Sequence, residues 1–597
     1  MSDKSIWIAG IARGHNAAIC LMKDGEIVFA IEEERLTRQK YDGGPLACML
    51  KIQEYTDKLD YLVVAHTTSL DGTAGKLDYS GEDVYSGLAR KMGLIEPHST
   101  NQVIDMSLYH HKMHAAAAFY RSGFEKAVSV IIDGAGTFFP IGIETPFGQE
   151  QLTMWETESI FTCNYPDQII TKHKTLGTRD MFVGIHQQEH IAESWEPAGS
   201  FEVSFSDRAG IVKAYEAVTE YCGWVSIEAG KTMGLSPYGK ENNSFPSLMD
   251  ETDLPNPLTN RNIILPRYPN GAVINSAFYK FLNDNTAEDL TTLENRRDLA
   301  YAVQKETQQA AADYIRYAVE KTGIKNVVVS GGYGLNCVAN YFYLKELDDL
   351  DINLYVEPVS NDAGTAIGCA LVWHYHKTGD TSVRTQQDAV YLGPKYDYTE
   401  ENITELSNKY NAIVEDATNE TVIDLITSKN IVSLFQGRSE NGPRALGNRS
   451  LIFDPTFKDG KDFVNEIKRR EYFRPFAGSI LEEDVHEWFD LRGMDSSPTM
   501  MYAVNCQPGV EEKIPSIIHV DGTCRIQTVN KEQNPHYYDL IKTFKDRTGV
   551  PIVFNTSFNL GGEPLVETLE DALWTLQQSD IEYLYLPEFG KLITVKN

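Results

Sequence analysis

Four glycine-containing turns, each directly after a strand-like apolar run, place the strongest constraint on the fold of this 597-residue chain. They read IARGHNAA (11–18), IIDGAG (131–136), VSGGYGLN (329–336) and VSNDAGTAIG (359–368). Backbone N–H groups at such turns bind phosphate oxygens when the turn opens a helix. One glycine after a strand is usually only a turn, but four in one region predict an α/β unit with ligand sites at its strand ends.

The segments around these turns support the prediction. A β-hairpin is expected near the start, because two strand-like runs are joined by Lys23-Asp24-Gly25, a strong turn signal. The apolar spacing and alanine content of residues 294–322 predict a long helix, and NVVVSGG after it predicts a strand. Strand, turn and helix alternate again over residues 352–376, which is the α/β pattern.

A second unit is expected after a polar stretch with glycine and proline at residues 376–395. Strand-like runs then recur as NIVSLFQG, GVPIVFN and IEYLYLP. The chain is also too long for one ordinary hydrophobic core. We therefore predict two domains, residues 1–380 and residues 390–597.

The chain is strongly acidic, since 54 Lys and Arg against 85 Asp and Glu give a net charge of −31. Such a charge repels nucleic acid unless a basic cleft overrides it, so it argues against a tRNA or DNA partner. The sequence shows no secretory signal pattern and no apolar run that could span a membrane. Its eight cysteines are scattered without a CxxC pair. We expect a cytoplasmic enzyme with reduced thiols and no membrane partner.

The histidines of LYHHKMHAAAAF indicate a metal site. His110 and His114 share one face of a helix that the alanines favour, whereas His111 points elsewhere. A lone HxxxH pair is more often structural, so other ligands are required. Asp133 and Asp362 each follow a strand and would singly be assigned to capping or turns. With both histidines they make a two-His, two-carboxylate set that suits Fe(II), Mn(II) or Zn(II) better than Ca(II).

Cationic residues gather in the second region of the chain. They occur in QGRSENGPRALGNRS, IKRREYFRPFAG and HVDGTCRIQ, and FNTSFNLGGEP adds hydroxyl and amide groups. Arginine forks and backbone amides suit phosphate or carboxylate groups. Any one arginine could instead face solvent or pair with an acidic residue, but the segments together predict an anion site.

Taken together, these motifs resemble the O-carbamoyltransferases of the nodulation-protein-U type, which include tobramycin and cephamycin carbamoyltransferases. The resemblance covers nearly the whole chain, and GPRALGNRS and FNTSFN are its most specific segments. It implies an α/β protein in which an actin-like ATPase domain, similar to the tRNA threonylcarbamoyl transferase subunit, precedes a YrdC-like α/β domain. It also implies that the YrdC-like domain makes carbamoyl adenylate from ATP and carbamoyl phosphate. The actin-like domain would then transfer the carbamoyl group to a substrate hydroxyl beside a bound metal, usually iron, with Mg²⁺ as a further candidate cofactor.

The resemblance also implies roles for individual residues. His15 would be the histidine needed for transfer, and the metal ligands would be His110, His114, Asp133 and Asp362. The nucleotide would be bound by Lys40, Gly331, Gly332 and Asn336. Carbamoyl phosphate or the adenylate would be bound by Arg438, Arg444, Lys468, Arg474, Arg525 and Ser557.

The sequence departs from the family pattern at three places. Thr137 stands where the family has glutamate, which puts the acceptor or its base in doubt; GGYGLN replaces GGVALN and FRPFAG replaces FRPFAP. Two alternative functions remain: a threonylcarbamoyl-type transferase acting on tRNA, and a non-catalytic regulator that binds nucleotide or metal. The acceptor is expected to be a small hydroxyl compound, namely a natural product, a sugar or a nucleoside or nucleotide. The oligomeric state is open, with a dimer as one candidate.

Overall fold

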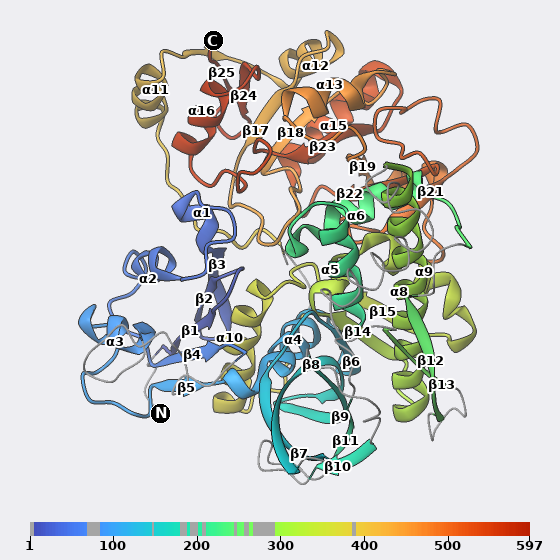
Figure 1. Ribbon diagram of the computed structural model, residues 1–597. Coiled ribbons are helices and arrows are strands. Elements are labelled where there is room, and N and C mark those ends of the chain that lie inside the picture. Colours follow the sequence, from blue (N-terminus) through green and yellow to red (C-terminus); the bar gives the residue numbers. More distant parts are fainter. Residues whose placement is uncertain are drawn as a thin grey trace. The chain divides into compact units, whose positions relative to one another are not determined.

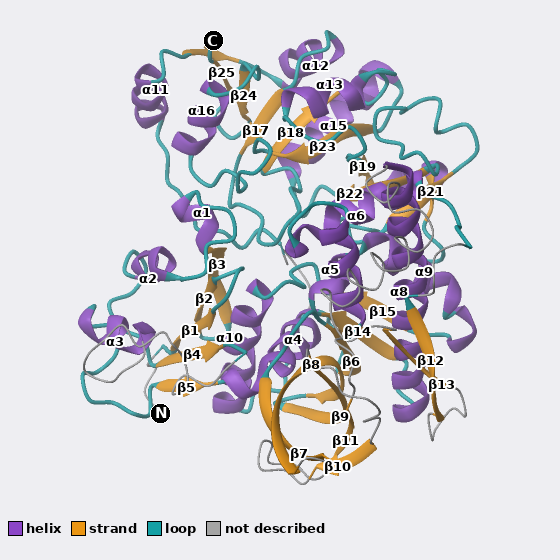
Figure 2. Ribbon diagram, in the orientation of Figure 1, coloured by secondary structure: helices purple, strands orange, loops and turns teal. Residues whose placement is uncertain are grey.

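The computed structural model describes residues 5–67, 84–145, 148–178, 188–191, 201–205, 210–243, 248–255, 262–266, 293–384 and 390–596. The chain forms two compact units that do not follow one another simply along the sequence. The first comprises Met1–Ile27 and Gly43–Gln386, and the second comprises Val28–Asp42 and Gln387–Asn597. Figures 1 and 2 show that both units contain helices and strands.

A five-stranded mixed sheet begins the described part of the chain, in the order β3-β2-β1-β4-β5. Its strands are β1 (Trp7–Ala12), β2 (Ala18–Lys23), β3 (Glu26–Glu32), β4 (Tyr61–Ala65) and β5 (Val103–Asp105). The predicted hairpin is confirmed, because β2 and β3 flank Asp24 and Gly25, whose φ angles are 50° and 84°. Two positive φ angles are typical of the type I′ turn, whose twist matches that of a hairpin.

The second sheet of this unit has eight described strands in the order β10-β11-β9-β8-β6-β14-β15, with β7 paired to β8. The strands are β6 (Lys126–Ile132), β7 (Phe138–Thr145), β8 (Gly148–Asn164), β9 (Gln168–Thr178), β10 (Gln188–Ile191), β11 (Phe201–Phe205), β14 (Asn326–Ser330) and β15 (Asn353–Val356). Strands β6, β14 and β15 are parallel neighbours, so their carboxyl ends lie on one edge. A two-stranded ribbon is formed by β12 (Met249–Pro255) and β13 (Asn262–Pro266).

The helices of the first unit pack against these sheets. They are α2 (Leu46–Ile52), α3 (Val84–Lys91), α4 (His110–Arg121), α5 (Ile211–Tyr221), α6 (Ala229–Leu235), α8 (Leu293–Thr322), α9 (Cys337–Glu346) and α10 (Ala363–Thr378). Helix α8 confirms the long helix predicted from residues 294–322. Helix α10 fits closely between α4 and β1, because a Cβ on Gly368 would lie 1.9 Å from the Met113 carbonyl oxygen. A Cβ on Gly10 would lie 2.0 Å from the Ala366 carbonyl oxygen.

The second unit contains a mixed sheet of ten described strands in the order β16-β25-β24-β17-β18-β23-β19-β22-β21-β20. Its strands are β16 (Ile413–Asp416), β17 (Val432–Phe435), β18 (Arg449–Phe453), β19 (Ala477–Leu481), β20 (Phe489–Asp490), β21 (Ala503–Cys506), β22 (Thr523–Val529), β23 (Ile552–Ser557), β24 (Tyr583–Leu586) and β25 (Lys591–Thr594). The three strands predicted from apolar runs in this region correspond to β17, β23 and β24. The helices are α11 (Glu400–Lys409), α12 (Asn419–Thr427), α13 (Gly460–Ile467), α14 (Val485–Trp488), α15 (Pro535–Thr548) and α16 (Leu569–Gln577).

An N-terminal segment, residues 28–42, is built into this second unit and carries the short helix α1 (Glu33–Thr37). The Ala30 N–H donates to the Leu392 carbonyl over 2.7 Å. The Arg35 guanidinium donates to the Gly442 carbonyl, and that of Arg38 donates to the Leu565 carbonyl over 2.6 Å. These bonds tie the segment to the second unit.

A search of the described helices for one with the length and apolar character to cross a membrane finds none.

Candidate functional site

Four side chains from three separate elements converge in the first unit. His110 and His114 lie one turn apart on α4, Asp133 directly follows β6, and Asp362 directly precedes α10. One ligand atom from each residue lies within 4.8 Å of the other three. The structure therefore brings together the four residues that the sequence suggested as metal ligands.

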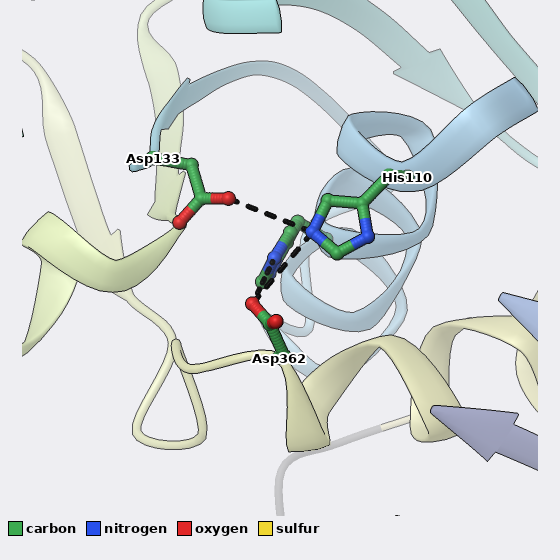
Figure 3. Close-up of side chains that lie close together, drawn as sticks. His110, Asp133 and Asp362 are labelled. Atoms are coloured by element: carbon green, nitrogen blue, oxygen red, sulfur yellow. Dashed lines mark ion pairs between the residues drawn. The ribbon is translucent and has the colours of Figure 1, made fainter. Parts of the chain in front are cut away.

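Figure 3 shows the Asp133 and Asp362 carboxylates facing His110. His110 Nε2 lies 3.5 Å from Asp133 Oδ2 and 3.7 Å from Asp362 Oδ1. His114 Nε2 lies 3.8 Å from the same Asp362 oxygen. Two metal bonds of about 2.1 Å would span about 4.2 Å, so a small contraction brings all four atoms to a common ion.

The cluster fits a cation because it contains buried nitrogen atoms that have no hydrogen-bond partner among the described residues. His110 Nδ1, His110 Nε2 and His114 Nε2 are buried and have no hydrogen-bond partner there. Leaving such groups unpaired is costly, and a metal ion would satisfy the Nε2 atoms. The Asp133 carboxylate is oriented by a hydrogen bond, because its Oδ1 accepts the Gly332 N–H over 2.9 Å. Its other oxygen, Oδ2, faces His110. Asp362 forms no capping hydrogen bond with α10, so the capping alternative does not account for its side chain.

The charges of the four residues are strongly linked. Burial by itself lowers the pKa of His110, but the Asp133 and Asp362 carboxylates outweigh burial and raise this pKa to about 10. Burial by itself raises the pKa of Asp362, but His110 and His114 hold it well below its usual range. The buried Asp133 and the partly buried Asp362 carboxylates thus attract a positive charge that a proton or a divalent cation can supply.

His15, the predicted transfer residue, lies beside this cluster. It occupies the loop between β1 and β2, its Nδ1 is 3.9 Å from Asp362 Oδ2, and its side chain is 49% exposed. An exposed imidazole next to a buried, charged centre can accept a proton from a hydroxyl group that approaches from solvent.

The predicted nucleotide residues fall in both units. Gly331 and Gly332 follow β14, and a Cβ on Gly331 would lie 2.4 Å from the Ile132 carbonyl oxygen. The Asn336 side chain caps α9 by accepting the Ala339 N–H, and it also donates to Gln304 over 3.0 Å. Lys40 belongs to the second unit, where its Nζ lies 2.8 Å from Glu34 Oε1.

A cationic cluster in the second unit, formed by Lys468, Arg470, Arg474 and Arg525, includes three of the predicted anion-binding residues. Lys468 is fully buried and donates to the Ser557 carbonyl, while Arg470 Nη1 lies 3.5 Å from Thr556 Oγ1. Burial first, and then Arg474 and Arg525, lower the pKa of Arg470.

The pKa of Lys468 is lowered by burial first, and then by Arg470 and Arg474. These cations repel one another where water is partly excluded, so binding of an anionic ligand among them is favoured. Arg474 also lies 3.6 Å from Glu471, so part of its charge is already balanced.

Other arginines of GRSENGPRALGNRS have structural contacts. The Arg438 guanidinium donates to the carbonyls of Val28, Leu392 and Gly393. Arg444 lies half-buried in the loop between β17 and β18. In the same loop Glu440 Oε1 accepts the N–H groups of Leu446, Asn448 and Arg449, which fixes the path of the backbone.

Sequence reasoning placed Arg470 in a cationic segment without giving it an individual role, and it did not identify His111 or Glu156 as site residues. Arg470 stands between two predicted residues in KRREYFR, so its position was the available signal. His111 and Glu156 lie near Asp133 through folding alone, since β8 brings Glu156 to the loop after β6. Thr137 is buried; its hydroxyl donates to the Ser107 carbonyl and accepts the His110 N–H at the start of α4.

Two family models match the chain. The model described as Carbamoyltransferase N-terminus matches residues 84–371, and Carbamoyltransferase C-terminus matches residues 423–591. Among solved structures, the crystal structure of full-length HypF in the phosphate- and nucleotide-bound form is 12% identical, with a TM-score of 0.37, and the similarity covers 64% of this chain and 56% of that one.

Relatives are similar over most of their length. "Uncharacterized protein sll1178" of Synechocystis sp. is 30% identical, and the match covers 96% of this chain and 94% of that protein. "Nodulation protein NolO" of Bradyrhizobium diazoefficiens is 30% identical, with 80% and 78% covered. "Nodulation protein NolNO" of Sinorhizobium fredii is 28% identical, with 96% and 78% covered. Because both carbamoyltransferase models match and 30% identity extends over most of two relatives, the protein belongs to the carbamoyltransferase family and is a carbamoyl-transferring enzyme.

Proposed function

We propose that the protein is an O-carbamoyltransferase that uses ATP and carbamoyl phosphate. The second unit, with a YrdC-like role, would hydrolyse carbamoyl phosphate with one water to carbamate and phosphate. The carbamate oxygen would then attack the α-phosphorus of ATP, which forms carbamoyl adenylate and releases pyrophosphate. The first unit, with an actin-like ATPase fold, would transfer the carbamoyl group to the hydroxyl of a small molecule and release AMP. One observation carries the proposal: two histidines and two carboxylates converge, with His15 beside them, in a chain of the carbamoyltransferase family.

Carbamoyl transfer needs an electrophile and a proton acceptor. A divalent cation such as Fe(II), held by His110, His114, Asp133 and Asp362, would polarise the carbamoyl carbonyl oxygen. His15 would take the proton of the acceptor hydroxyl as the new C–O bond forms and the bond to AMP breaks. Because His15 Nδ1 is 3.9 Å from Asp362, the carboxylate would orient the ring and stabilise the imidazolium that results.

Adenylate formation needs positive charge where phosphate groups react. Lys468, Arg470, Arg474 and Arg525 supply it, and the Ser557 hydroxyl lies 3.4 Å from Lys468 Nζ. Arginine forks fit phosphate oxygens in pairs, while a buried lysine acts as a point charge. Arg438 and Arg444 would belong to the loop that bounds this site, with the Arg438 guanidinium engaged by backbone carbonyls.

Gly331, Gly332 and Asn336 of the first unit belong to the same proposal as nucleotide contacts, and Lys40 of the second unit is a separate candidate for such a contact. The two glycines suit close approach of a ligand to the backbone. Asn336 would have to exchange its bond with Gln304 for one with the nucleotide, and Lys40 would have to leave Glu34.

The test is a stepwise assay of the full-length protein loaded with Fe(II) under anaerobic conditions. With ATP present, pyrophosphate should appear only after carbamoyl phosphate is added. Candidate sugars, nucleosides and natural products should then gain one carbamoyl group by mass spectrometry, together with AMP release. Pyrophosphate release that does not depend on carbamoyl phosphate, or none at all, would contradict the proposal.

A further inference from the structure

His111 follows His110 on α4 and lies close to Asp133 of the four-residue centre. Its side chain is completely buried, and its Nε2 lies 3.9 Å from Asp133 Oδ2. This is the same oxygen that faces His110 Nε2 over 3.5 Å. Among the described residues, Nε2 of His111 has no hydrogen-bond partner, whereas Nδ1 lies 2.8 Å from the Ser159 hydroxyl.

The position of the His111 proton follows from these neighbours. A neutral imidazole carries one N–H, and the second nitrogen accepts. If the Ser159 hydroxyl donates to Nδ1, the proton is on Nε2 and points toward the Asp133 carboxylate. The opposite tautomer would direct a nitrogen lone pair at that carboxylate, which is unfavourable. The geometry therefore favours an Nε2–H group directed at Asp133.

A buried ion pair completes the surroundings of His111. Lys174 donates to Glu156 Oε1, and Glu156 Oε2 accepts the Thr137 N–H over 2.9 Å. A Cβ on Gly136 would lie 2.6 Å from both Glu156 Oε2 and His111 Nε2, so the loop after β6 passes close to both groups. The charges of Glu156 and Asp133 both act on His111. The Glu156 carboxylate is already engaged by Lys174 and the Thr137 N–H, so Asp133, whose Oδ2 lies 3.9 Å from Nε2, is the carboxylate left to accept the His111 N–H.

We propose that His111 is a positioning residue for the metal centre, donating Nε2–H to Asp133 Oδ2 in a tautomer set by Ser159. The inference rests on the metal centre of the proposed function. The His111 bond would form by an approach of about 1 Å, since N–H···O bonds are about 2.9 Å long. With the Gly332 N–H on Oδ1, both oxygens of Asp133 would then be held in place for the ion.

Hydrogen bonds to a ligating carboxylate fix its orientation, and losing one typically lowers metal affinity by about 10–100-fold. His111→Leu should therefore bind Co²⁺ with a Kd about 10–100-fold higher than the unmodified protein, at the same stoichiometry. His111→Gln places an amide N–H near the position of Nε2 and should restore part of the affinity. Ser159→Ala keeps the ring but frees its tautomer, and it should weaken binding in the same direction by a smaller factor.

The experiment is a Co²⁺ titration of the full-length protein, followed by calorimetry and by the visible absorption bands of Co²⁺. His173→Leu is the matched control, because His173 is also buried in this unit but its ring bonds to Tyr314 and Ser204. This control should keep the Kd of the unmodified protein, whatever its stability.

The outcomes separate the inference from the proposed centre. An unmodified protein that binds no Co²⁺ would overturn the centre and the inference together. Normal binding by the unmodified protein with an unchanged Kd in His111→Leu and Ser159→Ala would overturn the inference alone. Altered absorption bands in His111→Leu would make His111 a ligand and also overturn its positioning role.

Discussion

Replacing Gly368 by alanine tests whether the contact between α4 and α10 sets the geometry of the centre. The new Cβ would lie 1.9 Å from the Met113 carbonyl oxygen and 3.2 Å from the Ala117 nitrogen. Ordinary contact begins at 3.4 Å, so the helices must move apart by about 1.5 Å. Met113 lies between the two histidines of α4, and Asp362 begins α10. The separation therefore widens the distances of 3.7 Å and 3.8 Å from these histidines to Asp362.

Two measurements follow from this argument. Overpacking of this kind costs about 1–3 kcal/mol, which thermal unfolding of the metal-free protein should detect. Metal affinity should fall as well, since ligand distances tolerate deviations of only about 0.2 Å. Gly230→Ala is the control, because Gly230 also lies in a helix but a Cβ there meets nothing within 4 Å. Unchanged stability and metal affinity in Gly368→Ala would refute the reasoning.

Three further variants test the two sites and the core. His114→Ala should bind less metal than the unmodified protein, as elemental analysis would show, because the centre loses one of four ligands; full occupancy would contradict the assignment. Arg474→Ala should abolish release of pyrophosphate, whereas His15→Ala should keep pyrophosphate release and stop carbamoyl transfer. If both variants failed in the same half-reaction, adenylate formation and carbamoyl transfer could not be assigned to separate sites. Desolvation on burial lowers the pKa of His173 to about 3. In the unfolded protein this histidine has its ordinary pKa of about 6.5, so it binds a proton below that pH while the folded protein keeps it neutral. The free energy of unfolding therefore falls by about 2 kcal/mol as the pH is lowered to 5. His173→Gln should flatten this pH dependence in urea unfolding, and an equally steep curve would show that His173 is not its cause.

Local patterns predicted local structure well. The turn at Asp24-Gly25, the long helix α8 and the pair of histidines on one face of α4 all depend on neighbours within a few residues. Their geometry follows from turn chemistry and from the helical repeat. The structure also brings Asp133 and Asp362 to those histidines. Asp133 directly follows β6 as expected, whereas Asp362 lies beyond the end of β15 and directly before α10.

Contacts between distant segments could not be read from such patterns. Residues 28–42 join the second unit because Arg35 and Arg38 bond to backbone carbonyls more than 400 positions away. In the same way, the Arg438 guanidinium is engaged by the Val28 carbonyl, although its motif suggested a phosphate ligand. An arginine fork binds carbonyls and phosphates with the same donors, so only the fold decides which partner it meets.

Asp362 departs from the usual role of an aspartate that stands just before a helix. An aspartate just before a helix normally accepts a backbone N–H, and this cap stabilises by about 1 kcal/mol. Asp362 precedes α10 with helical backbone angles, φ −56° and ψ −26°, and its side chain makes no such bond. The carboxylate instead lies 3.7 Å and 3.8 Å from two buried histidine nitrogens and 3.9 Å from His15. Because burial by itself disfavours its charge, this placement is stable only with a cation or a proton at the histidines. Its helical backbone angles do not suit a capping residue, so the carboxylate can take the role of a metal ligand that we propose for it.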